Sequence, residues 1–401
     1  MTGWLNAKTF YAELKALKDY FGAMAPELEV TVRDPALGVE GYVVVWNTAI
    51  SASGPLEGCA KGGTRITPQV TLDEVRMLAR TMALKNAAAG LPLGGAKSGL
   101  KLDPDAPGFE KQYRRFVRLC APILHENGGP FGGFGFDIGA RPEHALWACD
   151  ELKSTHSFTG KPLHLGGTDY DREGIAGLGV AVAARTMLEV YGDSADKSSF
   201  AVQGLGAMGA AVLRYFSEMD ARLAALGDPR YGGTWTFDSP PSGELRAALA
   251  AQEVEKAKPL LVAQARKVSD DPADVLYCPV DVLFPCAVQN AITTGNVERV
   301  QARYVCEGAN APVTEDARAQ LHRRGTPVVP DFIANPGGVI AAFVELTSDS
   351  ASKAEQAKAL AREKIAANVR RLFEITQRYG ADPQDAAMYI ALSRIRGGVG
   401  V

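Results

Sequence analysis

Four charged residues in the first third of the chain have the types and spacing that a catalytic centre needs. Lys61, Lys85, Lys97 and Asp137 follow one another at intervals of 24, 12 and 40 residues. Lys97 stands in the run Leu-Pro-Leu-Gly-Gly-Ala-Lys-Ser-Gly, where glycine allows backbone and substrate to approach closely. A lysine held partly out of water near other cations has a lowered pKa, which suits an acid, a base or an amine nucleophile.

Glycine-rich surroundings distinguish most of these residues from ordinary surface charges. Lys61 is followed by two glycines, Lys97 has two glycines just before it, and Asp137 follows the glycine-rich stretch 128–135. Lys85 also fits a solvated position in the last turns of a predicted helix. We interpret the four residues as one candidate site, and a structural role for each residue is the alternative.

A glycine motif in the middle of the chain predicts a dinucleotide-binding loop. Its residues are Gly204, Leu205, Gly206, Ala207, Met208 and Gly209. The motif follows a predicted strand, 199–203, and opens a predicted helix, 210–219, which is the context that this loop requires. Gly204 would form the turn, Gly206 would admit the pyrophosphate, and Gly209 would let the helix pack on the sheet. Free N–H groups at the helix N-terminus would bind the phosphates.

Asp228 is the acidic residue expected about 20 positions after such a loop. Its carboxylate would accept hydrogen bonds from both ribose hydroxyls and would repel a 2′-phosphate, which favours NAD over NADP. Arg230 could reverse this preference by pairing with a phosphate. The alternative interpretation is a glycine turn followed by a surface aspartate.

Short apolar strands and helices alternate after residue 165, and this alternation predicts a parallel sheet covered on both faces. We therefore expect an α/β chain with two domains around a deep cleft. The substrate domain is 1–170, completed by a C-terminal helical part, 350–401, and the Rossmann-type domain is 171–349. The predicted strands are 41–50, 199–203, 223–226, 275–278, 282–285, 304–307 and 327–329. The predicted helices are 8–22, 71–89, 109–124, 142–153, 174–191, 210–219 and 353–378.

Composition restricts the class of protein. The chain has 401 residues, of which 46% are hydrophobic and 22% charged, so it is long enough for two or three ordinary globular domains. A net charge of −3 gives no reason to expect nucleic acid or an anionic membrane as a partner. The six cysteines form no Cys-x-x-Cys pair and the five histidines form no cluster, so we expect no metal site. The N-terminus lacks a secretory signal pattern, and we expect a cytoplasmic protein.

The motifs together resemble the glutamate/leucine/phenylalanine/valine dehydrogenase family, and most closely its glutamate branch. The resemblance covers roughly residues 40–350, with the motifs in the family's order. The segments that carry it are 61–65, 85–97, 137–139, 158–162, 166–168, 307–310, 330–331 and 335–339. It implies reversible, NAD(P)-dependent oxidative deamination of an L-amino acid, for which L-glutamate, giving 2-oxoglutarate and ammonia, is the expected substrate.

The resemblance also implies a role for each candidate residue. Lys97 matches the catalytic lysine that polarises the carbonyl or imine and activates water, and Asp137 matches the acid/base that shuttles protons to and from the amine. Lys85 matches the lysine that binds the substrate α-carboxylate, and Lys61 matches the one that binds a side-chain carboxylate. In the same way, Gly62 is expected at the substrate, and Thr168, Asn310 and Asn335 lie in motifs expected at the coenzyme.

Two departures from the glutamate branch concern the substrate pocket. Ala342 stands where a serine is usual, and Gly135 stands where an alanine is common, so the pocket is expected to be roomier and less polar. Lys61 favours an acidic substrate, because burying an unpaired ammonium against an apolar side chain is costly. The alternative is a dehydrogenase of a larger or apolar amino acid, of the leucine, phenylalanine or tryptophan type.

Two further departures from the family pattern are Ala176, near the expected nicotinamide site, and Ala207, in the glycine motif. They leave the choice between NAD and NADP open. The resemblance implies a homo-oligomer, as a hexamer, an octamer or a dimer. A catalytically inactive nucleotide-binding relative is a further alternative, although the presence of both Lys97 and Asp137 argues against it.

Overall fold

The computed structural model describes residues 7–52 and 54–398, which divide into two compact units. The first unit comprises the described residues up to Tyr170, together with Val339–Ala357 and those from Met388 onward. The second unit comprises Asp171–Gly338 and Lys358–Ala387. The predicted α/β class with two domains is confirmed. The predicted bounds of the functional domains stay a prediction. The packing groups residues 358–387 with the second unit, because Ile365 and Phe373 contact the helix that contains Gly179 and ends near Tyr191.

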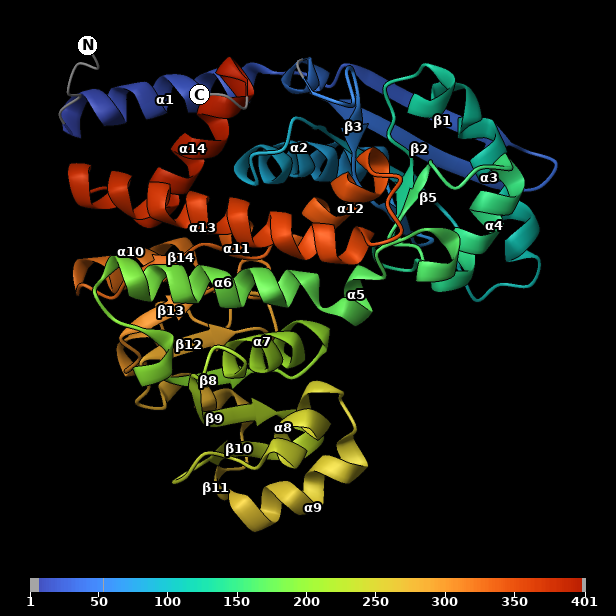
Figure 1. Ribbon diagram of the computed structural model, residues 1–401. Helices are drawn as coiled ribbons and strands as arrows, with labels where there is room; N and C mark the ends of the chain where they lie inside the picture. Colours follow the sequence, from blue (N-terminus) through green and yellow to red (C-terminus); the bar gives the residue numbers. More distant parts are fainter. Residues whose placement is uncertain (1–6, 53, 399–401) are drawn as a thin grey trace. The chain divides into compact units, whose positions relative to one another are not determined.

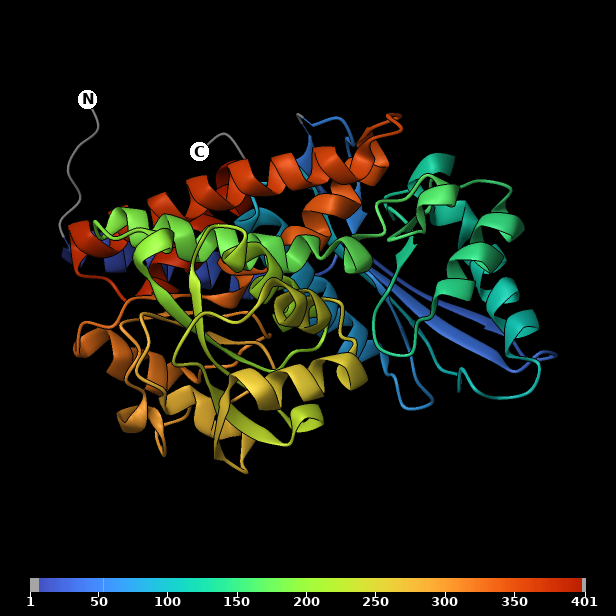
Figure 2. The ribbon, with the colours of Figure 1, turned by 60° about the horizontal axis from the view of Figure 1, so that its bottom comes forward.

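A five-stranded sheet forms the centre of the first unit. β1 and β2 pair antiparallel, β2 and β5 pair antiparallel, and β3 and β4 run parallel to β5. Helices α3 and α4 lie along one side of the β1–β2 pair (Figures 1 and 2). The strands are β1 Leu28–Asp34, β2 Val39–Trp46, β3 Ala60–Lys61, β4 Thr64–Ile66 and β5 Gly94–Leu100. A separate parallel pair is formed by β6 Phe134–Gly135 and β7 Phe158–Thr159.

The helices of the first unit follow the predicted pattern closely. Thr71 caps α2 by accepting a hydrogen bond from the Glu74 N–H, and Gly90, with a φ of +70°, follows the end of the helix. The helices are α1 Ala7–Ala23, α2 Leu72–Ala88, α3 Phe109–Cys120, α4 Pro142–Leu152 and α12 Gly337–Thr347, with part of α14 Pro383–Gly397. The 3₁₀ helices are η1 Thr48–Ser51, η2 Ala121–Ile123, η3 His125–Asn127 and η4 Leu163–Leu165.

Two predicted elements of this unit are too long. The strand predicted to reach residue 50 ends at Trp46, because Asn47 takes a left-handed conformation with a φ of 61° and begins a 3₁₀ turn. The helix predicted to reach residue 124 ends at Cys120, where Pro122 enters a 3₁₀ turn. The glycine-rich segment around Lys97 is the interior of strand β5, which is not among the strands predicted from the sequence.

The glycines of β5 allow helix α2 to pack directly on the sheet. A Cβ on Gly95 would lie 2.2 Å from the Ala83 N, and one on Gly99 would lie 2.5 Å from a Val75 methyl group. Because alternate strand residues face the same side, the side chain of Lys97 belongs to the same face as these two glycines. The small residues around the lysine are therefore required by packing.

Replacement of Gly95 by alanine tests this packing directly. We expect Gly95→Ala to lower the free energy of unfolding by about 1–3 kcal/mol or more, because the backbone of α2 cannot move aside cheaply. Gly22→Ala in α1 is the matched control, since its Cβ would meet no atom within 4 Å. Urea unfolding of both variants measures the difference, and equal stability of the two would contradict the predicted clash.

A seven-stranded sheet forms the centre of the second unit, in the order β11-β10-β9-β8-β12-β13-β14 (Figure 1). The five strands from β9 to β14 in this order run parallel, whereas β10 and β11 form an antiparallel edge. The predicted parallel sheet is thus confirmed except at this edge. The strands are β8 Ser199–Gln203, β9 Arg222–Asp228, β10 Gly233–Thr236, β11 Arg266–Ser269, β12 Val282–Pro285, β13 Tyr304–Cys306 and β14 Val328–Val329.

Helices α6, α7 and α8 of the second unit are neighbours in that order (Figure 1). A Cβ on Gly177 would lie 2.5 Å from the Ala211 Cβ, so α6 and α7 meet closely. The helices are α5 Tyr170–Glu173 at the start of the unit, α6 Ile175–Val190, α7 Ala207–Ser217, α8 Gly243–Ala250, α9 Val254–Gln264, α10 Glu315–Arg323, α11 Asp331–Ala334 and most of α13 Lys353–Tyr379. The 3₁₀ helices are η5 Ala195–Lys197, η6 Pro229–Tyr231, η7 Pro272–Tyr277 and η8 Val297–Arg299.

The strand predicted over 275–278 is wrong, because this segment belongs to the 3₁₀ helix η7 and its end. Asp271 caps that helix by accepting a hydrogen bond from the Ala273 N–H, and Pro272 occupies its first turn. The local cap therefore overrides the strand preference of the valine and tyrosine that follow. Among the helices that the structure describes, none has the length and apolar character needed to cross a membrane.

Candidate active site

A buried ion pair joins Lys97 to Asp137 in the first unit. The Lys97 Nζ lies 2.6 Å from the Asp137 Oδ2, and Lys97 is only 6% exposed. Strand β5 carries Lys97, whereas Asp137 lies in the loop between β6 and α4. Arg65 on β4 adds a second cation, with its Nε and Nη2 each 3.4 Å from an oxygen of the same carboxylate. The structure thus brings two of the four predicted residues into direct contact.

Burial and charge together set the pKa values of this pair. Burial lowers the pKa of the Lys97 ammonium more than the Asp137 carboxylate raises it. Burial raises the pKa of Asp137, but Lys97, the Ile138 N–H and Arg65 outweigh it, so this pKa lies below its ordinary value. At neutral pH the carboxylate is therefore ionised beside a lysine that releases its proton more easily than an exposed one.

Lys61, at the end of β3, points its ammonium into a ring of backbone carbonyl groups. The residue is 3% exposed. Its Nζ donates to three carbonyl oxygens, those of Gly62 at 3.1 Å, Gly133 at 2.8 Å and Phe134 at 2.5 Å. Burial is the main cause that lowers the pKa of Lys61 to about 7, and the cations Lys161 and Lys97 act in the same direction. Lys61 is thus a buried group whose charge changes near neutral pH.

The glycines beside Lys61 have different roles. A Cβ on Gly135 would lie 3.4 Å from the Lys61 Nζ and 3.1 Å from the Thr159 Oγ1, so the glycine keeps space at the ammonium. A Cβ on Gly62 would lie 1.7 Å from the Ala96 carbonyl oxygen, so no larger residue fits there. Close packing explains Gly62 without any contact to a substrate, and its predicted substrate contact stays a prediction.

The other two residues predicted to bind substrate lie on helices. Lys85 is half-buried in the last turn of α2. The neighbouring Asn86 ties this turn to the sheet, because its Nδ2 donates to the carbonyl oxygens of Lys61 at 3.3 Å and Gly94 at 2.8 Å. Ala342 on α12 is 8% exposed. The substrate contacts of Lys85 and Ala342 stay predictions.

Glu345, which the sequence did not predict, organises the loop that contains Thr168. Its fully buried carboxylate accepts hydrogen bonds from the Thr168 N–H at 2.7 Å and the Thr168 hydroxyl at 2.5 Å. It also accepts from the Gly160 N–H and from the Lys161 Nζ, the latter at 3.0 Å. Glu345 follows Ala342 by three positions on α12, which places both on one side of that helix. The Thr168 hydroxyl therefore has a protein partner, and its predicted role at the nicotinamide stays a prediction.

The glycine motif of the second unit has the geometry that a pyrophosphate requires. Gly204 has a φ of +81°, and a Cβ on Gly209 would lie 1.8 Å from the Gly204 carbonyl oxygen, so both positions need glycine. A Cβ on Gly206 would meet nothing within 4 Å, which leaves this side of the loop open. Helix α7 begins at Ala207 without a side-chain cap, so its first N–H groups are available to an anion. The motif connects β8 directly to α7, as predicted.

Asp228 ends β9 and binds the glycine loop. Its Oδ2 accepts from the Leu205 N–H at 2.7 Å, and its Oδ1 accepts from the Arg230 N–H at 2.8 Å. The Arg230 guanidinium also donates to both carboxylate oxygens, at 3.0 and 3.1 Å. Burial raises the pKa of Asp228, but Arg230 and the two N–H groups outweigh it, so the group is ionised at neutral pH. Its carboxylate is thus already shared between the loop and an arginine.

Asn335 and Asn310 contact each other in the second unit. The Asn335 Nδ2 donates to the Gly308 carbonyl oxygen at 3.1 Å and to the Asn310 Oδ1 at 3.2 Å. The Asn335 Oδ1 is buried and has no hydrogen-bond partner among the residues that the structure describes. This acceptor is available to an amide donor, such as the nicotinamide carboxamide. Within residues 7–52 and 54–398, no group of three or more His, Cys, Asp or Glu residues is arranged to hold a metal ion.

Comparison with known proteins identifies the family. Residues 166–397 match the model of the glutamate/leucine/phenylalanine/valine dehydrogenases, and residues 26–153 match their dimerisation domain. A glutamate dehydrogenase from Thermotoga maritima is 32% identical over 92% of this chain and 89% of its own length. An NADP(+)-dependent glutamate dehydrogenase from Pyrobaculum calidifontis is 36% identical over 76% of this chain and 72% of its own length. The crystal structure of a hetero-hexameric glutamate dehydrogenase from Thermus thermophilus, in a Leu-bound form, has a TM-score of 0.71 at 26% identity, covering 97% and 95% of the two chains. The chain therefore belongs to the glutamate/leucine/phenylalanine/valine dehydrogenase family and is an amino acid dehydrogenase.

Proposed function

We propose that the protein catalyses the reversible oxidative deamination of L-glutamate to 2-oxoglutarate and ammonium, with NAD(P)⁺ as the hydride acceptor and water as the source of the keto oxygen. The observation that carries the chemistry is the buried contact of Lys97 with Asp137 at 2.6 Å. Two relatives that cover most of this chain are named glutamate dehydrogenases, which supports the same activity.

Lys97 and Asp137 divide the proton transfers between them in this proposal. When bound, NAD(P)⁺ would supply the acceptor for the hydride of the substrate α-carbon. The Lys97 ammonium polarises the resulting imine and, once deprotonated, activates the attacking water, a role that its lowered pKa favours. Asp137 carries protons to and from the departing amine. Lys97 and the Ile138 N–H, with a smaller contribution from Arg65, keep the pKa of Asp137 low, so its carboxylate is ionised between these transfers.

Lys61 supports an acidic side chain in the substrate. Its ammonium is buried, and Gly135 keeps a space open beside it. A substrate carboxylate that replaces one of its three carbonyl acceptors would pair the buried ammonium with a full negative charge, which a carbonyl oxygen does not offer. The alternative substrate, a larger or apolar amino acid, is favoured by the same space and by Ala342, which offers no hydroxyl.

Product analysis tests the reaction itself. The purified protein is incubated with L-glutamate and NAD⁺ or NADP⁺, and reduced coenzyme, ammonium and 2-oxoglutarate are each measured. We expect the three products in equal amounts. Two results would contradict the proposed deamination. One is reduced coenzyme that forms without ammonium, and the other is the absence of turnover both with glutamate and with every apolar amino acid tested.

For the coenzyme, we propose that Gly204, Gly206, Gly209 and the start of α7 hold the pyrophosphate, and that Asp228 selects NAD. The negative carboxylate near the ribose position would repel a 2′-phosphate. Arg230 does not offset this, because its guanidinium is paired with Asp228. One relative is named as NADP(+)-dependent and another as NAD-specific. The choice of coenzyme within the family therefore depends on local residues.

Substitution of Asp228 tests this selection. We expect Asp228→Ser to shift the ratio of kcat/KM for NADP⁺ over NAD⁺ upward by about tenfold or more, because Arg230 becomes free to bind a phosphate. Steady-state kinetics with both coenzymes give the ratio, and Arg230→Gln in the same background should return it toward the starting value. An unchanged ratio in Asp228→Ser would rule out Asp228 as the selector.

We further propose that the chain forms a homo-oligomer and acts in the cytoplasm. A match to the family's dimerisation domain over residues 26–153 and the similarity to a hexameric enzyme support assembly. Light scattering after size-exclusion chromatography would give the mass, and a 42.6 kDa monomer at micromolar concentration would contradict assembly.

The cysteines support the proposed cytoplasmic location. All six are free thiols, which fits a reducing compartment.

A further inference from the structure

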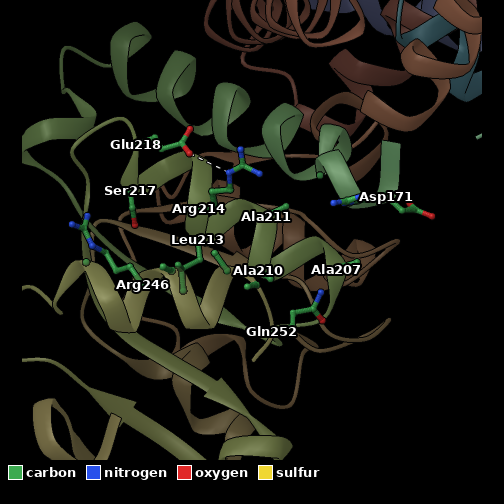
Figure 3. A pocket seen from close by; sticks show the side chains of 16 residues that line it. Asp171, Ala207, Ala210, Ala211, Leu213, Arg214, Ser217, Glu218, Arg246 and Gln252 are labelled. Atoms are coloured by element: carbon green, nitrogen blue, oxygen red, sulfur yellow. Dashed lines mark hydrogen bonds and ion pairs between the residues drawn. The ribbon is translucent and has the colours of Figure 1, made fainter. Parts of the chain in front are cut away.

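A pocket lies entirely within the second unit, between helices α7 and α8 with α5 at one end (Figure 3). Its volume is about 770 Å³, which is within the range of small-molecule sites. Ala207 is the only residue of the glycine motif among those that line it, and the three motif glycines do not line it. The pocket therefore extends away from the loop proposed to hold the pyrophosphate, along the length of α7.

The walls of this pocket are small and apolar along most of their length. Alanines from both helices face the hollow, namely Ala207, Ala210, Ala211, Ala247, Ala250 and Ala251. Because each alanine extends by only one methyl group, the two helices leave a space that larger side chains would have filled. Small walls alone do not indicate a ligand, so the polar groups of the pocket decide the question.

Two polar atoms at one end of the pocket are buried without partners. Ser217, the last residue of α7, is 8% exposed, and its Oγ has no hydrogen-bond partner among the described residues. The Arg246 Nε on α8 is also buried and has no hydrogen-bond partner among the same described residues. Figure 3 shows both side chains at the end of the hollow opposite Ala207 and Gln252. Buried polar atoms without a partner are uncommon in folded proteins, and an oxygen of a bound molecule would provide a partner for both of these.

The charges around the pocket favour an anion as this partner. Arg214 is already used, because its Nε donates to the Glu218 carboxylate at 3.1 Å and its guanidinium lies over the Tyr215 ring. Arg172 and Arg246 remain as cations, against the single carboxylate of Asp171. A hydroxyl and a guanidinium N–H match two oxygens of a carboxylate or phosphate.

We propose that this pocket binds a small anionic molecule with an apolar body. Arg246 and Ser217 hold its carboxylate or phosphate, and the alanines of α7 and α8 contact its body. The bound molecule would lie along the helix that begins at the coenzyme loop. This inference concerns a site separate from the proposed reaction and does not depend on the substrate assigned above.

Calorimetric titration of the full chain tests the proposal. The probes are phenyl phosphate and phenylacetate, which carry the two oxyanions on one apolar body, with benzyl alcohol as the uncharged probe. The titrations are done with and without saturating NAD⁺. We expect at least one anionic probe to bind with one-to-one stoichiometry in both conditions, and benzyl alcohol to bind about tenfold more weakly or not at all. Which anionic probe binds distinguishes a carboxylate from a phosphate ligand.

Variants locate the binding. We expect Ser217→Ala and Arg246→Met each to weaken probe binding by roughly tenfold while leaving amino acid dehydrogenase activity unchanged. Arg246→Lys keeps a positive charge and should weaken binding less than Arg246→Met. Arg266→Met, an exposed position on β11, is the matched control. Failure of both anionic probes to bind, competition with NAD⁺, or equal binding in the Arg246→Met and control variants would overturn the proposal.

Discussion

Replacing Lys97 with alanine is expected to lower kcat by about a thousandfold while the protein stays folded and binds coenzyme. The loss follows from the position of the ammonium, which is buried and 2.6 Å from the Asp137 carboxylate. Folding should survive, because Arg65 remains beside Asp137 and prevents an uncompensated buried charge. Steady-state kinetics measure the loss, and coenzyme fluorescence measures binding.

Lys101→Ala is the matched control for Lys97, since Lys101 is an exposed lysine just beyond the end of the same strand. Its turnover should equal that of the unmodified protein. If Lys97→Ala kept turnover within about tenfold of the original, which is some 1.4 kcal/mol of barrier, Lys97 could not be the catalytic lysine.

Replacement of Lys61 by methionine is expected to separate acidic from apolar substrates. We predict that kcat/KM for glutamate falls by about a hundredfold, because a substrate carboxylate would lose its charge-assisted hydrogen bond and stay buried without a partner. Turnover of leucine and phenylalanine should not fall, since neither needs the ammonium. Methionine has a similar length and removes a charge that burial disfavours, but it leaves three carbonyl oxygens without this donor, so circular dichroism has to show that the variant is folded. Equal losses for acidic and apolar substrates would contradict the assigned role.

The pH dependence of the same reaction tests the charge of Lys61. With a pKa of about 7, the group is an ammonium below that pH and neutral above it. The KM for glutamate should therefore rise as the pH increases through 7, whereas the KM for an apolar amino acid should not show this rise. In Lys61→Met the rise should disappear, which distinguishes Lys61 from other titrating groups.

The sequence predicted which residues meet at the site better than it predicted the local structure around them. The motifs identified Lys97 and Asp137, and the structure brings them into contact across 40 residues of chain. The sequence indicates that the glycines around Lys97 allow a substrate to approach closely, whereas in the structure they let α2 approach a strand, in which Lys97 pairs with Val44 of β2. Local preference cannot reveal this, because the contact depends on residues distant in the chain.

Glu345 shows why some site residues could not be predicted from the sequence, whereas Arg65 had a signal in it. Glu345 lies 177 residues from Thr168 and carries no local motif, so only the fold brings it to the loop that it anchors. Arg65 follows Lys61 within a motif that the sequence analysis did identify, and its contact with Asp137 could have been suspected from charge alone. Thr159 beside Gly135 had no signal beyond its place in another motif.

The most direct test of the account compares kcat/KM for L-glutamate with the values for L-leucine, L-phenylalanine and L-tryptophan, each with NAD⁺ at saturation. Lys97 and Asp137 are proposed to carry out the chemistry, and Lys61 to select the substrate. We therefore expect kcat/KM for glutamate to exceed that for each apolar amino acid by about a hundredfold. A higher kcat/KM for any of the three apolar amino acids would contradict it, and would assign the space at Gly135 and Ala342 to an apolar side chain.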